Sequence, residues 1–158
     1  RAVALSALVS LTIVSGGFVA GLKAGKLYNT FPMMGDYWLP PGYSALEPAW
    51  RNLFENPILV QFDHRVLALL TFAAVLAFAA ALARSAVRGA GGAAPPRRAL
   101  TACSLLLLAA VTQVALGILT LLNHVPIVLA SLHQAVAVLL LTAALYLTHA
   151  LSGRIRAC

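Results

Sequence analysis

Residues 57–83 read PILVQFDHRVLALLTFAAVLAFAAALA, an apolar run that opens with a proline and carries a histidine, His64, seven residues later. Residues 126–151 repeat this arrangement, since Pro126 is followed seven residues later by His133. At a rise of about 1.5 Å per residue, both imidazoles lie roughly 10 Å into their helices from the same side. Ligating residues are costly in hydrocarbon and are usually functional there. The matched depth therefore predicts that the two histidines act together.

The composition of the chain indicates that lipid is its solvent. Of its 158 residues, 61% are hydrophobic and 9% are charged, and the mean hydropathy is +0.92. A chain this apolar cannot hide its hydrophobic surface in a water-soluble core. The net charge of +7 arises from basic residues clustered at segment ends rather than on one face. This placement favours membrane orientation over nucleic-acid binding.

Four segments approach the roughly 20 apolar residues that a bilayer requires, at about 2–22, 57–83, 99–122 and 126–151. They predict an all-α fold, a single domain over residues 1–158 that forms a bundle of four transmembrane helices. Arginines lie in the linker 84–98 and after the last segment. The positive-inside rule then places this linker and both termini on the cytoplasmic or matrix side, and the loop 24–56 outside.

The two histidine-bearing segments also indicate an internal repeat. Each half of the chain is a helical hairpin, in which an outer connection leads to a second helix with histidine at the same offset from a proline. In the first segment, Gly17, Gly21 and Gly25 recur at four-residue spacing. This G-x-x-x-G spacing favours close helix packing, with the close approach of a cofactor edge as the alternative.

Two histidines at one depth on separate helices are the pattern of axial ligands to a haem iron. Small residues one turn from each histidine, Ala68 on one helix and Ala130 and Ala137 on the other, leave room for a flat macrocycle. Zinc fits less well because it needs three or four ligands, and the sequence offers no third strong ligand at this depth. The alternative is that His64 and His133 only form hydrogen bonds to neighbouring helices.

Other polar residues at this depth are candidate cofactor-binding residues. Arg65 is costly in the membrane unless it is paired, either with Asp63 and the acidic residues of the outer loop or with a haem propionate. Gln113 and Gln134 are candidates to orient a ligand through hydrogen bonds, or else to join helices.

Two further histidines are not expected to reach the iron. His124 lies in the outer turn before the fourth segment and is expected in solvent, with contact to the cofactor edge as the alternative. His149 lies sixteen residues beyond His133, about 24 Å along the helix. The predicted metal ligands are therefore His64 and His133.

Several motifs in one register carry a family resemblance over nearly the whole chain. They are GGFVAGLKAG (16–25), YNTFPMMG (28–35), EPAWRN (47–52), VQFDHR (60–65), QVALGI (113–118) and LHQ (132–134). Together they resemble the C-terminal half of haem A synthase, the COX15/CtaA family. The resemblance implies an oxidoreductase of two pseudo-symmetric four-helix halves that oxidises a methyl group of haem O to the formyl group of haem A for terminal oxidases.

The same resemblance assigns a role to the histidine pair. His64 and His133 match the family's C-terminal pair, which is associated with a bound haem b. In the family, a glutamate shortly before the first histidine marks the half that handles haem O and haem A, whereas Gln61 stands here. The chain therefore resembles the electron-transfer half, and no catalytic base is assigned.

The resemblance also implies a setting for the chain. We expect an integral membrane protein of the bacterial or mitochondrial inner membrane, surrounded by lipid and binding haem. Its expected partners are an N-terminal half or a second copy of the chain, together with terminal oxidase assembly factors. Two alternatives from other classes are a stand-alone b-type cytochrome subunit and a non-haem membrane adaptor whose histidines only pack.

Overall fold

The computed structural model describes residues 1–88 and 95–152, and within these ranges it contains four long helices and no β-strand. The long helices are α1 (Ala2–Gly21), α3 (Pro57–Arg88), α4 (Arg97–Leu122) and α5 (Ile127–Ser152). The loop between α1 and α3 holds three short elements, η1 (Ala24–Lys26), η2 (Ala49–Arg51) and α2 (Asn52–Glu55). The predicted all-α fold is confirmed.

The helix boundaries differ from the sequence expectation around the linker 84–98. Helix α3 continues to Arg88 instead of ending at residue 83, and α4 begins at Arg97 instead of residue 99. Hydropathy predicts where the apolar part of a segment ends, but not where its helix ends. Alanine, serine and arginine tolerate helical backbone, so the helix continues beyond the apolar part. The central part of that linker lies outside the described residues.

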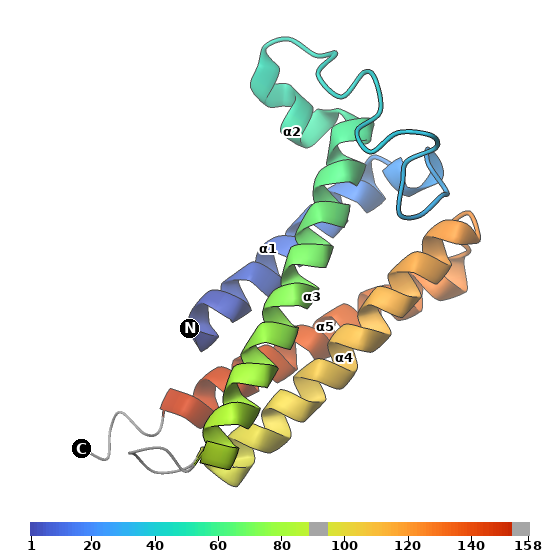
Figure 1. Ribbon diagram of the computed structural model, residues 1–158. Helices are drawn as coiled ribbons and strands as arrows, with labels where there is room; N and C mark the ends of the chain where they lie inside the picture. The colour runs from blue at the N-terminus through green and yellow to red at the C-terminus, as the bar shows by residue number, and fades with distance from the viewer. Residues whose placement is uncertain (89–94, 153–158) are drawn as a thin grey trace.

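The four long helices form two hairpins, α1 with α3 and α4 with α5 (Figure 1). The helices lie together at the lower end of the view and spread apart towards the loop that joins α1 to α3. The closed end is a core of small and branched side chains in which Leu106, Leu147 and Val9 are fully buried. Hydrogen bonds of 3.0 Å between Ser6 and Thr148, and of 2.7 Å between Thr12 and Thr71, join α1 to α5 and to α3.

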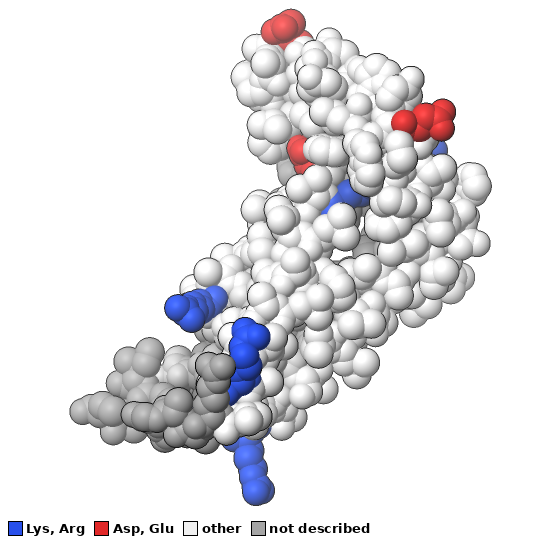
Figure 2. Space-filling view, viewed as in Figure 1, with Lys and Arg blue, Asp and Glu red and all other residues white. Residues whose placement is uncertain are grey.

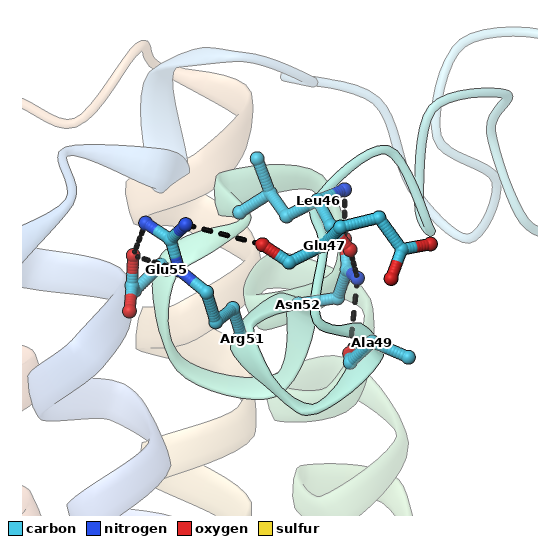
Figure 3. Close-up of polar contacts among 6 residues, drawn as sticks. All are labelled: Leu46, Glu47, Ala49, Arg51, Asn52 and Glu55. Atoms are coloured by element: carbon cyan, nitrogen blue, oxygen red, sulfur yellow. Dashed lines mark hydrogen bonds and ion pairs between the residues drawn. The ribbon is translucent and has the colours of Figure 1, made fainter.

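A network of polar contacts orders the loop between α1 and α3 (Figure 3). The Asn52 side chain, 3% exposed, accepts a hydrogen bond from the Leu46 amide and donates to the carbonyls of Leu46 and Ala49. Arg51 and Glu55 form an exposed ion pair of 2.6 Å. Hydrogen bonding within this pair raises the pKa of Arg51 and lowers that of Glu55. Because both side chains face water, the pair adds little stability, and Asn52 is the main organising residue.

The outer surface of the bundle is that of a membrane protein. Large apolar side chains such as Leu108, Val138 and Leu11 are more than half exposed, and all four long helices are long and apolar enough to cross a bilayer. Figure 2 shows all the visible acidic side chains at the loop end together with some basic ones, further basic side chains towards the opposite end, and a largely uncharged surface between. The chain is an integral membrane protein.

Candidate functional site

A cavity of about 620 Å³ opens where the two hairpins spread apart. Residues from all four long helices line it, and both His64 of α3 and His133 of α5 are among them. The structure therefore brings the two sequence-predicted histidines into one cavity. A volume of this size is within the range of pockets that hold small molecules and cofactors.

The His64 ring contacts Ser15, which sequence reasoning missed. Ser15 Oγ donates its proton to the Thr12 carbonyl at 2.7 Å and lies 2.8 Å from His64 Nδ1. When the hydroxyl proton lies towards the Thr12 carbonyl, Ser15 accepts from Nδ1–H of a neutral ring. The Nε2 lone pair is then available to a metal, in the arrangement typical of ligating histidines.

The His133 ring has a different environment. Gln113 on α4 contacts its Nε2, with 3.4 Å between the two nitrogens. In the described part of the chain, Nδ1 of His133 is buried without a hydrogen-bond partner. The structure thus joins His133 to Gln113, one of the two glutamines singled out in the sequence. The other, Gln134, is exposed and lines the cavity.

Unsatisfied polar atoms are concentrated around this cavity. Five buried side-chain nitrogen or oxygen atoms lack a hydrogen-bond partner among the described residues, and all five belong to cavity-lining residues: Gln61, Arg65, Gln113, Thr120 and His133. Buried polar groups are normally paired, and each exception calls for an explanation. Their clustering indicates a site that a bound molecule or water completes.

The remaining wall of the cavity is apolar and partly small. Ala68, Ala130 and Ala137 line it, as the sequence predicted for residues one turn from each histidine. Larger apolar side chains complete the wall, among them Ile13, Phe72, Val114, Ile118 and Leu140. Such a lining suits a flat, largely apolar group held by a few polar contacts.

Arg65 does not form the ion pair considered from the sequence. Its Nη1 donates to the carbonyls of Thr30 at 2.8 Å, Met33 at 3.2 Å and Pro32 at 3.4 Å, and its Nη2 donates to the Tyr28 carbonyl at 2.8 Å. Over residues 1–88 and 95–152 the one ion pair formed is Arg51–Glu55, outside the cavity. The outer loop thus supplies backbone carbonyls, which sequence patterns do not reveal, and leaves Arg65 Nε as the unpaired donor.

Two lysines at the loop end of the cavity were not singled out in the sequence. Lys23 and Lys26, just beyond the end of α1, line the cavity beside Arg65. His124 does not line it, although its neighbour Val125 does. His149 lies in the last turn of α5, far from the cavity.

Among the described residues, the predicted glycine ladder packs against another element at one of its three positions. A Cβ atom built at Gly17 or Gly21 would meet nothing within 4 Å, whereas one at Gly25 would lie 3.2 Å from Val125 Cγ2. Four-residue spacing places glycines on one helix face but does not show whether another element covers that face. Gly17 instead lines the cavity, consistent with the alternative of an approaching cofactor edge.

The donor set suits a metal already held by another group. Two imidazoles provide two nitrogen ligands, and no cluster of three or more His, Cys, Asp or Glu side chains occurs among the described residues. A bare zinc ion requires three or four protein ligands, whereas a macrocycle that supplies four nitrogens leaves only two axial positions. The cavity therefore fits a bis-histidine haem on its ligand count, its volume and its unpaired polar atoms.

Fold and site together define a helical membrane protein with paired histidines in one cavity between two hairpins. Residues 1–145 match the COX15-CtaA family, described as cytochrome oxidase assembly protein, and the chain belongs to this family. No solved structure matches the chain significantly.

Its relatives are named as haem A synthases. Heme A synthase of Nitrosospira multiformis is 48% identical over 147 residues, which cover 93% of this chain and 39% of that protein. Heme A synthase of Rhodopseudomonas palustris is 50% identical over 142 residues, 89% of this chain and 37% of the relative. Heme A synthase COX15 of Homo sapiens is 46% identical over 144 residues, which cover 91% of this chain and 33% of that protein. The chain thus spans about a third to two fifths of the relatives it matches.

Proposed function

We propose that the cavity binds one haem b, with His64 and His133 as the two axial ligands of its iron. The observation that carries this proposal is that both imidazoles, from different hairpins, line the same cavity. The Ser15 hydrogen bond supports it, because it leaves Nε2 of His64 as the free ligand atom. The choice of haem b rests on the resemblance of the chain to the C-terminal half of haem A synthase.

The other cavity residues have roles that follow from their chemistry. The apolar wall excludes water and lowers the local dielectric constant around the group. Arg65, Lys23 and Lys26 provide positive charge at the loop end of the cavity, which would pair with propionate carboxylates. Gln113 contacts Nε2 of His133, whose lone pair would bind the iron, so haem binding would replace this contact. Gln134 would form hydrogen bonds at the cofactor edge. When bound, a haem with both axial positions filled by imidazoles supplies one-electron transfer rather than an open site for oxygen.

We further propose that the chain acts as the C-terminal, electron-transfer half of a haem A synthase. The complete protein would oxidise haem O to haem A for terminal oxidase assembly, with haem O and haem A bound in its N-terminal half. That half, or a second copy of this chain, is the proposed partner, together with terminal oxidase assembly factors. The family membership and the names of the relatives support this proposal.

The proposed membrane is the bacterial or mitochondrial inner membrane, with both termini on the cytoplasmic or matrix side. The basic residues Arg84, Arg88, Arg97 and Arg98 support this orientation, because they flank the end of the bundle opposite the outer loop. The cavity and its histidines then lie towards the outer side.

Substitution of the two histidines tests the haem proposal. We expect His64→Ala and His133→Ala each to abolish the low-spin bis-histidine absorption and EPR spectrum of the membrane-embedded chain, because each removes one axial ligand. His149→Ala is the matched control, since His149 lies in a membrane-type helix away from the cavity, and it should leave the spectrum intact. A bis-histidine spectrum that persists in both cavity variants would overturn the proposal.

A further inference from the structure

Two glycines lie directly against the two candidate ligands. A Cβ atom built at Gly16 would lie 3.0 Å from Cε1 of His64 and 3.6 Å from each of its ring nitrogens. A Cβ atom built at Gly117 would lie 3.0 Å from Cε1 of His133, and 3.6 Å and 3.7 Å from Nδ1 and Nε2. The two contacts therefore match atom for atom.

The match extends to the placement of the residues in the fold. Gly16 belongs to α1 and faces a histidine of α3, while Gly117 belongs to α4 and faces a histidine of α5. In each hairpin, the backbone of the first helix thus lies against the imidazole of the second. The sequence indicated the repeat only through the two proline–histidine intervals, and neither glycine was singled out for a contact of this kind.

A side chain at either position would displace the ring. Ordinary van der Waals contact begins at 3.4 Å, so a methyl group at 3.0 Å would force the imidazole to move by a few tenths of an ångström. The His64 ring cannot move freely, because its Nδ1 is held by Ser15 at 2.8 Å. Glycine is the residue that permits so close an approach of backbone to another group.

We infer that Gly16 and Gly117 are positioning residues, which set where the two imidazoles sit by letting a helix backbone lie directly against each ring. The contact itself is independent of any cofactor. Its consequence for metal ligation rests on the proposed haem site, because a displaced ring would present its Nε2 at a different place in the cavity.

A double-mutant cycle tests the contact without haem. Alanine is also a better helix former than glycine. The stability change of Gly16→Ala alone therefore combines a gain in helix propensity with the loss caused by the clash with the ring. In the haem-free chain, we expect Gly16→Ala to lower the folding equilibrium constant about tenfold more with His64 present than in a His64→Ala background. The cross pair, Gly16→Ala with His133→Ala, should show no such coupling. Gly117→Ala should couple in the same way to His133 and not to His64.

The haem-loaded chain provides the second measurement. We expect Gly16→Ala and Gly117→Ala to weaken haem retention about tenfold, and to change the EPR g values, which report the orientation of axial imidazoles. Gly21→Ala is the control, since a Cβ there meets nothing within 4 Å and Gly21 does not line the cavity. This control should leave both readouts unchanged.

The outcomes separate the two proposals. Absence of coupling in both cycles, or unchanged g values and retention in both alanine variants, would overturn the positioning role while leaving the haem site intact. Coupling in a chain that never binds haem would support the glycine contact and contradict the proposed function instead.

Discussion

Ser15 shows how a single hydroxyl can set the hydrogen bonding of an imidazole. With its proton towards the Thr12 carbonyl, its oxygen accepts from His64 Nδ1–H, and in this tautomer Nε2 is unprotonated. A histidine whose second ring nitrogen donates its proton in a hydrogen bond becomes a stronger electron donor to a metal. No equivalent hydroxyl contacts His133 among the described residues, where the polar contact is with Gln113. The two imidazoles therefore have chemically different surroundings.

Substitution of Ser15 tests this asymmetry. We expect Ser15→Ala to weaken haem binding about tenfold, since the loss of such an outer partner costs about 10- to 100-fold in metal affinity. The reduction potential should rise, because a less basic imidazole stabilises ferric iron less. Potentiometric titration and haem retention measure the two effects.

Ser10 offers the matched control for Ser15. Among the residues that the structure describes, its hydroxyl bonds only to the Ser6 carbonyl of its own helix, and it does not line the cavity. Ser10→Ala should therefore change neither quantity. A potential in Ser15→Ala equal to that of the unsubstituted chain would contradict the role given to the hydroxyl.

At the scale of elements, Arg65 joins α3 to the outer loop. Its guanidinium donates to carbonyls between Tyr28 and Met33, and Gln61, one turn earlier, donates to the same Tyr28 carbonyl at 3.0 Å. Hydrogen bonds to charged groups are among the stronger ones in proteins. This part of the loop is thereby held over the cavity that His64 lines.

Removal of this charge tests the attachment of the loop. We expect Arg65→Gln to speed amide hydrogen exchange at Met34, Gly35 and Tyr37 about tenfold, equivalent to about 1.4 kcal/mol of local stability. These amides are bonded within the same loop segment, so their exchange reports its opening. Hydrogen-exchange mass spectrometry of the chain in nanodiscs measures the effect.

The control for Arg65 is the exposed arginine of the same loop. Arg51→Gln breaks the exposed ion pair with Glu55 and a hydrogen bond to the Glu47 carbonyl, and should leave exchange at these three amides unchanged. Equal exchange rates in Arg65→Gln and the unsubstituted chain would show that other contacts hold the loop in place.

At the scale of the whole molecule, the bundle is closed at one end and open at the other. Buried alanines such as Ala99, Ala102 and Ala144 let the helices approach closely at the closed end. Close approach through small residues is the usual way in which helices pack in lipid. The spread of the hairpins at the loop end then creates the cavity, so one molecule combines a packed anchor with an open binding region (Figure 1).

Haem analysis of cells that express the complete protein tests the proposed activity. We expect the full-length gene, expressed with a supply of haem O, to yield formyl-haem in extracted haems, and His64→Ala within it to lower that yield at least tenfold because electron transfer fails. Chromatography of the extracted haems measures both. Retention of haem b without any formyl-haem would instead indicate a stand-alone b-type cytochrome.

Hydropathy and length were sufficient to predict the four helices, because the need for about 20 apolar residues per span is a local property of each segment. Equal spacing from proline to histidine predicted that His64 and His133 act together, and both line one cavity. The alanines beside them were also correctly placed at the cavity, since residues three or four apart on a helix share a face. The motifs along the chain were sufficient to indicate its family.

The contacts between helices could be obtained only from the tertiary structure. These helices are apolar on nearly all sides, so the pattern of each one does not reveal how it is rotated towards its neighbours. For this reason, the sequence favoured Gly17 and Gly21 as packing positions, although the close contacts to the histidines are at Gly16 and Gly117. Ser15 and the carbonyl partners of Arg65 were hidden for the same reason, because they depend on how separate elements meet in space.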